Sequence, residues 1–228
     1  MTKREPLSKT RADAAAAGRP LREEITSAAI QGSAAALSIA GLLVLVHRAG
    51  PQSGVLPIIG AAVYGASLIV AFLASSLYHG MPHPRVKRIF RAIDHCTIFL
   101  LIAGTYTPIA LLVLWHHAGW LLLATIWTLA ILGVVLRLVR GPRFLRLAIP
   151  LYLAMGWLGV AWSGRIYEAV GLAPILLIIT GGIAYTGGLV FYHWSRMPFS
   201  NALWHLCVVA GTACFFLAIA LYVFPAAA

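Results

Sequence analysis

Charged residues and cysteines are both scarce in this chain of 228 residues. Only 10% of the residues are Asp, Glu, Lys or Arg, against about 25% in soluble domains, so an ordinary soluble domain is excluded. The three cysteines, Cys96, Cys207 and Cys214, lie in apolar segments, and their spacing fits neither a disulfide framework nor a zinc finger. We interpret them as small buried hydrophobic residues.

Apolar side chains dominate instead, at 61% of the residues and a mean hydropathy of +0.90. A helix of about 20 apolar residues crosses a hydrocarbon core about 30 Å thick. Because such runs recur along the chain, the sequence predicts an all-α polytopic membrane protein. We expect a seven-transmembrane helix bundle with spans at 26–46, 55–79, 92–114, 119–138, 147–163, 172–192 and 200–224.

The start of the chain differs from the rest in composition. Residues 1–22 are polar, basic and rich in alanine, which predicts a disordered basic cytoplasmic tail before a single domain at 23–228. The apolar run that follows is too long for a signal peptide and has no convincing cleavage site. We therefore expect it to be an uncleaved first span.

The formal net charge of +11 suggests a nucleic-acid partner until the charges are placed. With the N-terminus in the cytoplasm, fifteen Lys and Arg residues lie on the cytoplasmic side and only Arg48 and Arg165 lie outside. This bias predicts a cytoplasmic N-terminus and an external C-terminus in the cell membrane. Because the charges lie in a tail and in loops, we expect membrane lipids as partners and no nucleic acid.

Polar side chains recur at the cytoplasmic ends of three predicted spans. The second span ends with Ser75 and His79, and the third begins with Asp94. The seventh carries Asn201 and His205 in its first two turns. Residues four apart share a helix face, so each of these two pairs points in one direction. Ionisable groups in membrane spans are costly, which makes this set the candidate functional site.

Two imidazoles and a carboxylate at one depth favour a divalent metal, with zinc first. His79, His205 and Asp94 are the expected ligands, with Asn201 as a further one. Zinc lowers the pKa of its bound water to roughly 7. Asp94 would either bind the metal or accept the proton of that water, while Ser75 or Asn201 would orient a ligand or polarise a carbonyl.

The same residues also have a reading without metal. Histidines and an acid at a membrane boundary reach toward the headgroups or pair with a basic loop, as Asp94 could with Arg91. His95 projects about 100° away from Asp94 on an ideal helix, so we expect a neighbour of the site or a contact to lipid headgroups. No ligand role is expected for the remaining candidates: His47, His83, His116, His117, His193 and Glu168.

Four segments resemble the hemolysin III family, the bacterial branch of the progestin and adiponectin Q receptor (PAQR) superfamily. They are ASSLYH (74–79), DHCTIFLLIAGTYTP (94–108), GGIAYTGGLVFY (181–192) and PFSNALWHLCVVAGTAC (198–214). The resemblance covers roughly residues 22–224. It implies seven spans, a cytoplasmic N-terminus and a zinc site near the cytoplasm. His79 and His205 would be zinc ligands in it, and Asp94 would hold a zinc-bound water.

The chain departs from the family pattern at four positions. Asn201 replaces the first histidine of the His-x-x-x-His found in receptor-type members, and Phe215 replaces a further histidine of many bacterial relatives. Gln31 and Ser27 stand where relatives often have His and Asn. A three-histidine site cannot be assembled from the family positions, so Asp94, Asn201 or a water completes a weaker site, or the metal has been lost.

The resemblance implies zinc-dependent hydrolysis of an amide or ester bond in a membrane lipid, because the superfamily resembles membrane ceramidases. It also implies lytic activity and a link to membrane homeostasis. The alternative is non-enzymatic, either a receptor-like sensor or a pore-forming cytolysin. Polar residues at one end argue against a wide pore within one chain, although a homo-oligomer could form one between subunits. A transporter is less favoured because no inverted repeat is apparent.

Overall fold

The computed structural model describes residues 20–50, 54–194 and 196–225, and all regular structure within these ranges is helical. The predicted all-α class is therefore confirmed. The α-helices are α2 (Leu21–Ala49), α3 (Val55–Gly80), α4 (Pro84–Leu112), α5 (Gly119–Arg140), α6 (Leu145–Trp157), α7 (Ser163–Val170), α8 (Leu172–His193) and α9 (Ser200–Ala218). Short 3-10 segments occupy Trp115–His117, Gly141–Phe144 and Leu158–Trp162, and a π-helical turn at Ile219–Val223 extends α9.

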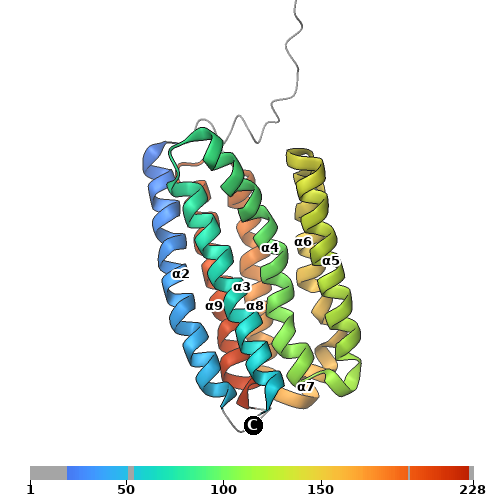
Figure 1. Ribbon diagram of the computed structural model, residues 1–228. Helices are drawn as coiled ribbons and strands as arrows, with labels where there is room; N and C mark the ends of the chain where they lie inside the picture. Colours follow the sequence, from blue (N-terminus) through green and yellow to red (C-terminus); the bar gives the residue numbers. More distant parts are fainter. Residues whose placement is uncertain (1–19, 51–53, 195, 226–228) are drawn as a thin grey trace, which may run out of the picture.

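The helices form an elongated bundle in which successive helices lie side by side (Figure 1). Helix α2 packs on α3, α3 on α4, and α4 on α5. Helix α9 packs on both α8 and α2, so the last helix of the chain closes the bundle against the first. This closure matters for function because it places the starts of α2 and α9 beside the end of α3.

Six helical segments are long and apolar enough to cross a membrane: Leu21–Ala49, Val55–Gly80, Pro84–Leu112, Gly119–Val170, Leu172–His193 and Ser200–Val223. The count differs from the seven predicted because one segment of 52 residues runs from α5 through α7. This segment turns after α5, where Gly141 has a φ of +58°, a backbone conformation that glycine adopts without steric cost. Beyond that turn, α5 and α6 lie side by side (Figure 1).

Two helices begin earlier than predicted. Helix α2 begins at Leu21 rather than 26, and the earlier part of the predicted tail lies outside the described residues. Helix α4 begins at Pro84 rather than 92, because proline suits the first turn of a helix, where its missing N–H is not needed. The basic stretch 85–91 is therefore helical rather than a loop.

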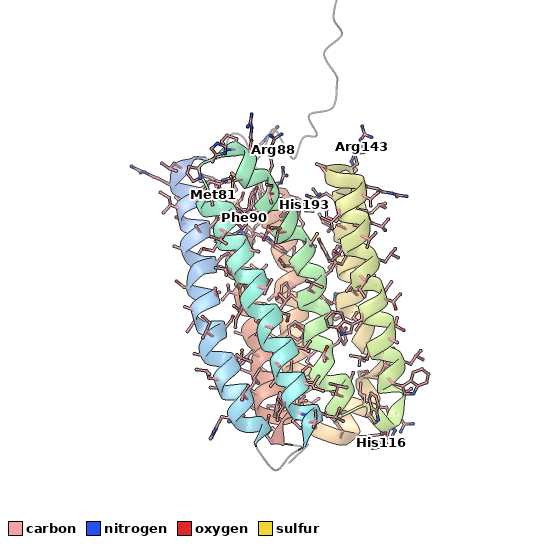
Figure 2. All side chains as sticks on the ribbon, viewed as in Figure 1. Met81, Arg88, Phe90, His116, Arg143 and His193 are labelled. Atoms are coloured by element: carbon pink, nitrogen blue, oxygen red, sulfur yellow. The ribbon has the colours of Figure 1, made fainter. Side chains whose placement is uncertain are left out.

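The two ends of the bundle differ in charge. Arg88, Arg143 and His193 lie toward one end, here called the basic end, and His116 lies at the other, here called the opposite end (Figure 2). Chain direction places the starts of α2, α4 and α9 and the end of α3 at the basic end (Figure 1).

An apolar core fills the opposite end. Leu45, Leu114, Leu122, Ile219 and Phe224 are each at most 2% exposed and belong to one cluster. Many outward-facing side chains are also large and apolar, among them Leu43, Ile131, Val139 and Ile183. An apolar exterior around an apolar core is the pattern of a bundle surrounded by lipid, because lipid leaves no reason to place polar groups outside.

Candidate functional site

Three helices bring the predicted site residues to the basic end. Ser75 and His79 lie in the last turns of α3, Asp94 lies near the start of α4, and Asn201 and His205 lie at the start of α9. All except Asp94 are at most 5% exposed, and Asp94 is half-buried. The structure therefore gathers residues that are more than a hundred positions apart in the sequence.

The two imidazoles face each other directly. Nε2 of His79 lies 2.9 Å from Nε2 of His205, and the rings meet edge to face with centroids 4.8 Å apart. The other ring nitrogen of each has its own partner: Nδ1 of His79 lies 3.1 Å from Oε2 of Glu24, and Nδ1 of His205 contacts the amide of Gln31. Nδ2 of Asn201 lies 3.4 Å from Nε2 of His79. Each imidazole is thus oriented by a contact at Nδ1, and its Nε2 points at the Nε2 of the other imidazole.

Counting the hydrogen-bond donors and acceptors shows two ways in which the ring nitrogens of this pair can all find partners. A neutral imidazole has one donor and one acceptor nitrogen, so His79 presents a lone pair at Nε2 when Nδ1–H donates to Glu24. If Gln31 donates its amide N–H to His205, then His205 donates Nε2–H to His79 and the chain closes without a metal. If Gln31 instead accepts from Nδ1–H with its carbonyl oxygen, two lone pairs face each other and require a cation between them.

The donor set fits zinc only in part. Two imidazole nitrogens with their opposite ring nitrogens hydrogen-bonded are the arrangement that metal-binding histidines adopt. However, the described residues contain no group of three or more His, Cys, Asp or Glu side chains placed to hold a metal ion. Near the pair, Asn201 presents its amide nitrogen to Nε2 of His79, and the carboxyl group of Asp94 interacts electrostatically with His79.

Two glutamates at the start of α2 contact the site residues. Glu23 and Glu24 are 6% and 7% exposed, and the Glu23 carboxylate accepts the backbone N–H of Asn201 at 3.0 Å. Glu24 contacts His79 and also pairs with Lys87 of α4, whose Nζ lies 2.5 Å from Oε2. These contacts tie the starts of α2, α4 and α9 to the end of α3.

Sequence reasoning gave these two glutamates no role. One signal was available, since they are two of only six acids in the chain and directly precede a long apolar run. Gln31 and Ser27 were noted only as departures from the family. In the structure, Gln31 contacts His205 and the hydroxyl of Ser27 accepts a hydrogen bond from Nδ2 of Asn201 at 3.1 Å.

Asp94 lies between the histidine pair and two guanidinium groups. Its carboxyl group forms a side-chain hydrogen bond with Ser75, and His79, Arg91 and Arg137 are close enough to interact electrostatically. Asp94 therefore interacts electrostatically both with Arg91 and with His79 of the site. Arg137 is only 4% exposed, although the sequence predicts the basic residues in the tail and in loops.

His95 turns away from the site toward α5, in keeping with the 100° offset from Asp94. It is 9% exposed, and its Nδ1 lies 3.3 Å from Nη2 of Arg137. The hydroxyl of Tyr152 donates to the His95 carbonyl oxygen at 2.6 Å. His95 is therefore a buried neighbour of the site, and the expected alternative of a lipid-headgroup contact is wrong.

Of the remaining candidates, His193 lines the same cavity as the histidine pair, and the others do not line it. His47, His83, His116, His117 and His193 are exposed. Glu168 is exposed as well and pairs with Arg165 at 3.0 Å. None of them joins the cluster around His79.

A cavity of about 1100 Å³ opens from the site into the bundle. Its wall at the basic end includes Ser75, His79, Asp94, Asn201 and His205. Most of the remaining wall is apolar and comes from α4, α6 and α8, for example Ile98, Ile102, Ile149, Leu153 and Ile178. Such a cavity suits a molecule with one polar end and a long apolar body.

These features define a helical membrane protein with a buried polar cluster at one end of its bundle. A family model described as "Haemolysin-III related" matches residues 21–216, and the chain belongs to that family. The resemblance drawn from the four sequence segments is thus confirmed.

Known relatives match over most of their length. Hemolysin-3 of Bacillus cereus is 39% identical over 207 residues, which cover 91% of this chain and 94% of that protein. The Hemolysin-3 homolog of Bacillus subtilis (strain 168) is 36% identical over 202 residues, 89% of this chain and 95% of that protein. The human monocyte to macrophage differentiation factor is 28% identical over 176 residues, 73% of this chain and 71% of that protein.

Proposed function

We propose that this chain crosses the cell membrane seven times, with the basic end in the cytoplasm and the C-terminus outside. The turn at Gly141 supports the seventh pass, because it divides the longest apolar segment between α5 and α6. From Leu145 to Trp162, α6 and its 3-10 extension span about 30 Å, which is the thickness of a hydrocarbon core. A C-terminal reporter fusion active in the cytoplasm would contradict this topology.

We further propose that the site hydrolyses an amide or ester bond of a membrane lipid with the help of zinc. The observation that carries this proposal is the pair of facing Nε2 atoms, 2.9 Å apart, at the polar end of a largely apolar cavity. His79 and His205 would hold the ion. The carboxylate of Asp94 would complete the set, or Asn201 would do so after its amide turns to present its oxygen in place of its nitrogen. When bound, zinc would supply an acidified water that reacts near neutral pH.

The surrounding residues have separate tasks in this proposal. Glu24 and Gln31 orient the two imidazoles through their Nδ1 atoms, which keeps both Nε2 atoms directed at the ion. Asp94 accepts the proton that the water loses, and the hydrogen bond from Ser75 holds its carboxylate in place. The apolar wall holds the acyl chain of the lipid and excludes bulk water.

A non-enzymatic sensor is the second candidate, and the orientation of Gln31 favours it. With the amide N–H of Gln31 directed at His205, hydrogen bonds run without interruption through both imidazoles to Glu24. A cavity of the same shape would then bind a lipid without cleaving it. A pore between subunits of a homo-oligomer is less supported, because the charged and imidazole side chains that line the cavity lie at the basic end.

Metal analysis of the purified protein separates these functions. We expect about one zinc per chain in the wild type, loss of zinc in His79→Ala and in His205→Ala, and retention in His116→Ala, an exposed control at the opposite end. Fatty acid released from ceramide-containing liposomes would then show hydrolysis, and dye leakage from the same liposomes would show a pore. A wild type that contains no metal when freshly purified at neutral pH would contradict zinc-dependent hydrolysis and leave the sensor.

A further inference from the structure

A stripe of buried polar side chains on α2 faces the first two turns of α9. Glu23, Ser27 and Gln31 follow one another at intervals of four residues, so they lie on one side of α2, and each is at most 6% exposed. The Glu23 carboxylate accepts the backbone N–H of Asn201, and the Ser27 hydroxyl accepts an N–H of its side chain. The amide of Gln31 contacts Nδ1 of His205. Every residue of this stripe thus contacts a residue of α9 that belongs to the candidate site.

The first turn of α9 needs such a partner because its own sequence provides no cap. The first backbone N–H groups of a helix have no acceptor within the helix, and a Ser, Thr, Asp or Asn at the N-cap position often satisfies the second or third. In α9 that position is Phe199, whose side chain has no oxygen and whose φ of +56° lies in the left-handed region that bulky residues avoid. Asn201 is the second residue of α9, and its N–H points to Glu23. The acid of α2 therefore stands where the oxygen of a local cap would stand.

A carboxylate suits this position better than a neutral oxygen. The start of a helix carries a partial positive charge, so a negative group placed there is stabilising. The next acid in the sequence has a different task, because the carboxylate of Glu24 contacts His79 of α3 and Lys87 of α4. Two neighbouring glutamates are thus divided between different helices, and Glu23 is the one directed at α9.

We propose that Glu23 is a positioning residue that caps α9 from α2 and thereby fixes where Asn201 and His205 lie. Its hydrogen bond holds the backbone of Asn201, whose side chain donates to Ser27 and lies 3.4 Å from Nε2 of His79. One turn further along α9, His205 meets the same Nε2 atom. The cap does not depend on a metal, whereas its effect on zinc binding rests on the proposed function.

The first test is the exchange of backbone hydrogens in the purified full-length protein, followed by mass spectrometry. Loss of a helix cap destabilises the end of a helix, so exchange at the start of α9 should be about fivefold faster in Glu23→Ala than in the wild type. Glu23→Gln keeps an oxygen that can accept the N–H, and its exchange should fall between the two. Glu24→Gln is the matched control, because it removes the same charge from a carboxylate that contacts α3 and α4. Its exchange at the start of α9 should stay within about twofold of the wild type.

A replacement cap on α9 itself provides a rescue. Phe199→Asn places a side-chain oxygen at the N-cap position, and asparagine tolerates a positive φ better than phenylalanine does. Phe199 is 44% exposed, so the change leaves the apolar core intact. Combined with Glu23→Ala, it should bring exchange at the start of α9 back to within about twofold of the wild type, whereas Phe199→Leu should not. A lack of rescue by Phe199→Asn would contradict the capping role.

Zinc affinity shows whether the cap positions the site or only stabilises the fold. Glu23→Ala should lower this affinity by roughly tenfold in competition with a chelator, the lower end of what the outer partners of metal ligands contribute. Leu122→Ala is the control, because it also lowers Tm but lies in the opposite-end core. Its zinc affinity in the folded fraction should stay within about twofold of the wild type. If Glu23→Ala does not fold, Glu23→Gln replaces it, with a smaller loss of affinity expected.

Three outcomes would overturn the inference in whole or in part. Equal exchange at the start of α9 in the wild type and Glu23→Ala would remove the cap, and an equal increase in Glu24→Gln would indicate a general loosening of the basic end. Faster exchange with unchanged zinc affinity would keep the cap but contradict its role in positioning the site. A wild type without zinc would contradict the proposed hydrolysis, and faster exchange in Glu23→Ala with rescue by Phe199→Asn would still support the cap.

Discussion

The same helices form both ends of this bundle, yet the two interiors have opposite chemistry. At the opposite end the buried side chains are apolar, as Leu114, Leu122 and Phe224 illustrate. At the basic end, Glu24 and Arg137 are buried to a similar degree and each has polar partners. Burying polar groups costs free energy unless each is hydrogen-bonded or paired. The comparison indicates that the opposite end mainly holds the helices together, whereas the basic end buries polar groups at a cost in stability.

The distribution of acids sharpens this contrast. Of the four acids among the described residues, Glu23, Glu24 and Asp94 lie at the basic end within or beside the site. Glu168 is exposed and pairs with its neighbour Arg165 on α7. A carboxylate in an apolar bundle is therefore associated with the histidine pair and its surroundings, not scattered along the spans.

The largest expected effect is the loss of function in His205→Ala. Removing this imidazole leaves a single histidine at the pair, so we expect zinc content and lipid hydrolysis to fall below detection. His205 does not belong to the apolar core clusters, so the helical content should be retained. Zinc analysis, fatty-acid release and circular dichroism of the same sample provide the three measurements. Unchanged hydrolysis would remove the histidine pair from the mechanism.

Leu122→Ala tests the other side of the comparison. Leu122 is fully buried in the opposite-end core, so its truncation should lower the free energy of unfolding by about 2–5 kcal/mol through lost contacts and the cavity left behind. Zinc content should stay at the wild-type level in the folded fraction. Leu121→Ala, at a side chain that is 46% exposed, is the control and should cost much less. Thermal melting in detergent gives the ranking.

Glu24→Gln should have a smaller effect, confined to the basic end. Gln keeps the size of the side chain but removes the charge that orients His79 and pairs with Lys87. Replacing such an outer partner lowers metal affinity by about 10–100-fold. Competition with a zinc chelator measures this change, and Glu168→Gln serves as the exposed control. Equal zinc affinity in wild type and Glu24→Gln would show that the carboxylate does not support the pair.

Much of the fold could be predicted because it follows from hydrophobic length alone. Runs of apolar residues identify α3, α5 and α8 to within a few positions, since lipid demands that each helix satisfies its own backbone. Charge scarcity and span direction likewise predicted that His79 and His205 would lie at one depth. These inferences need no knowledge of which helices touch.

The partners of the site could not be predicted in the same way. Glu24 contacts Nδ1 of His79, and Gln31 contacts Nδ1 of His205. The second contact exists because α9 packs against α2, and these two helices come from opposite ends of the chain. Nor does periodicity show that Arg137 is buried against His95, because a basic residue in the last turn of a span usually reaches the headgroups. The sequence thus predicts which segments are helices, but it does not predict which side chains pair between them.

The smallest expected effect is found when one cation is removed from the opposite end and compared with one removed from the basic end. Arg165 and Glu168 are 56% and 63% exposed, and an exposed pair of this kind contributes at most about 1 kcal/mol because water and salt screen it. Arg165→Gln should therefore leave Tm and zinc affinity close to wild type.

Lys87→Gln removes the same charge at the basic end, where Nζ lies 2.5 Å from a mostly buried carboxylate of Glu24. It should weaken zinc binding several-fold, because Glu24 then orients His79 less firmly. Equal zinc affinities in the two variants would mean that the effect of a cation on zinc binding does not depend on the end of the bundle at which it lies.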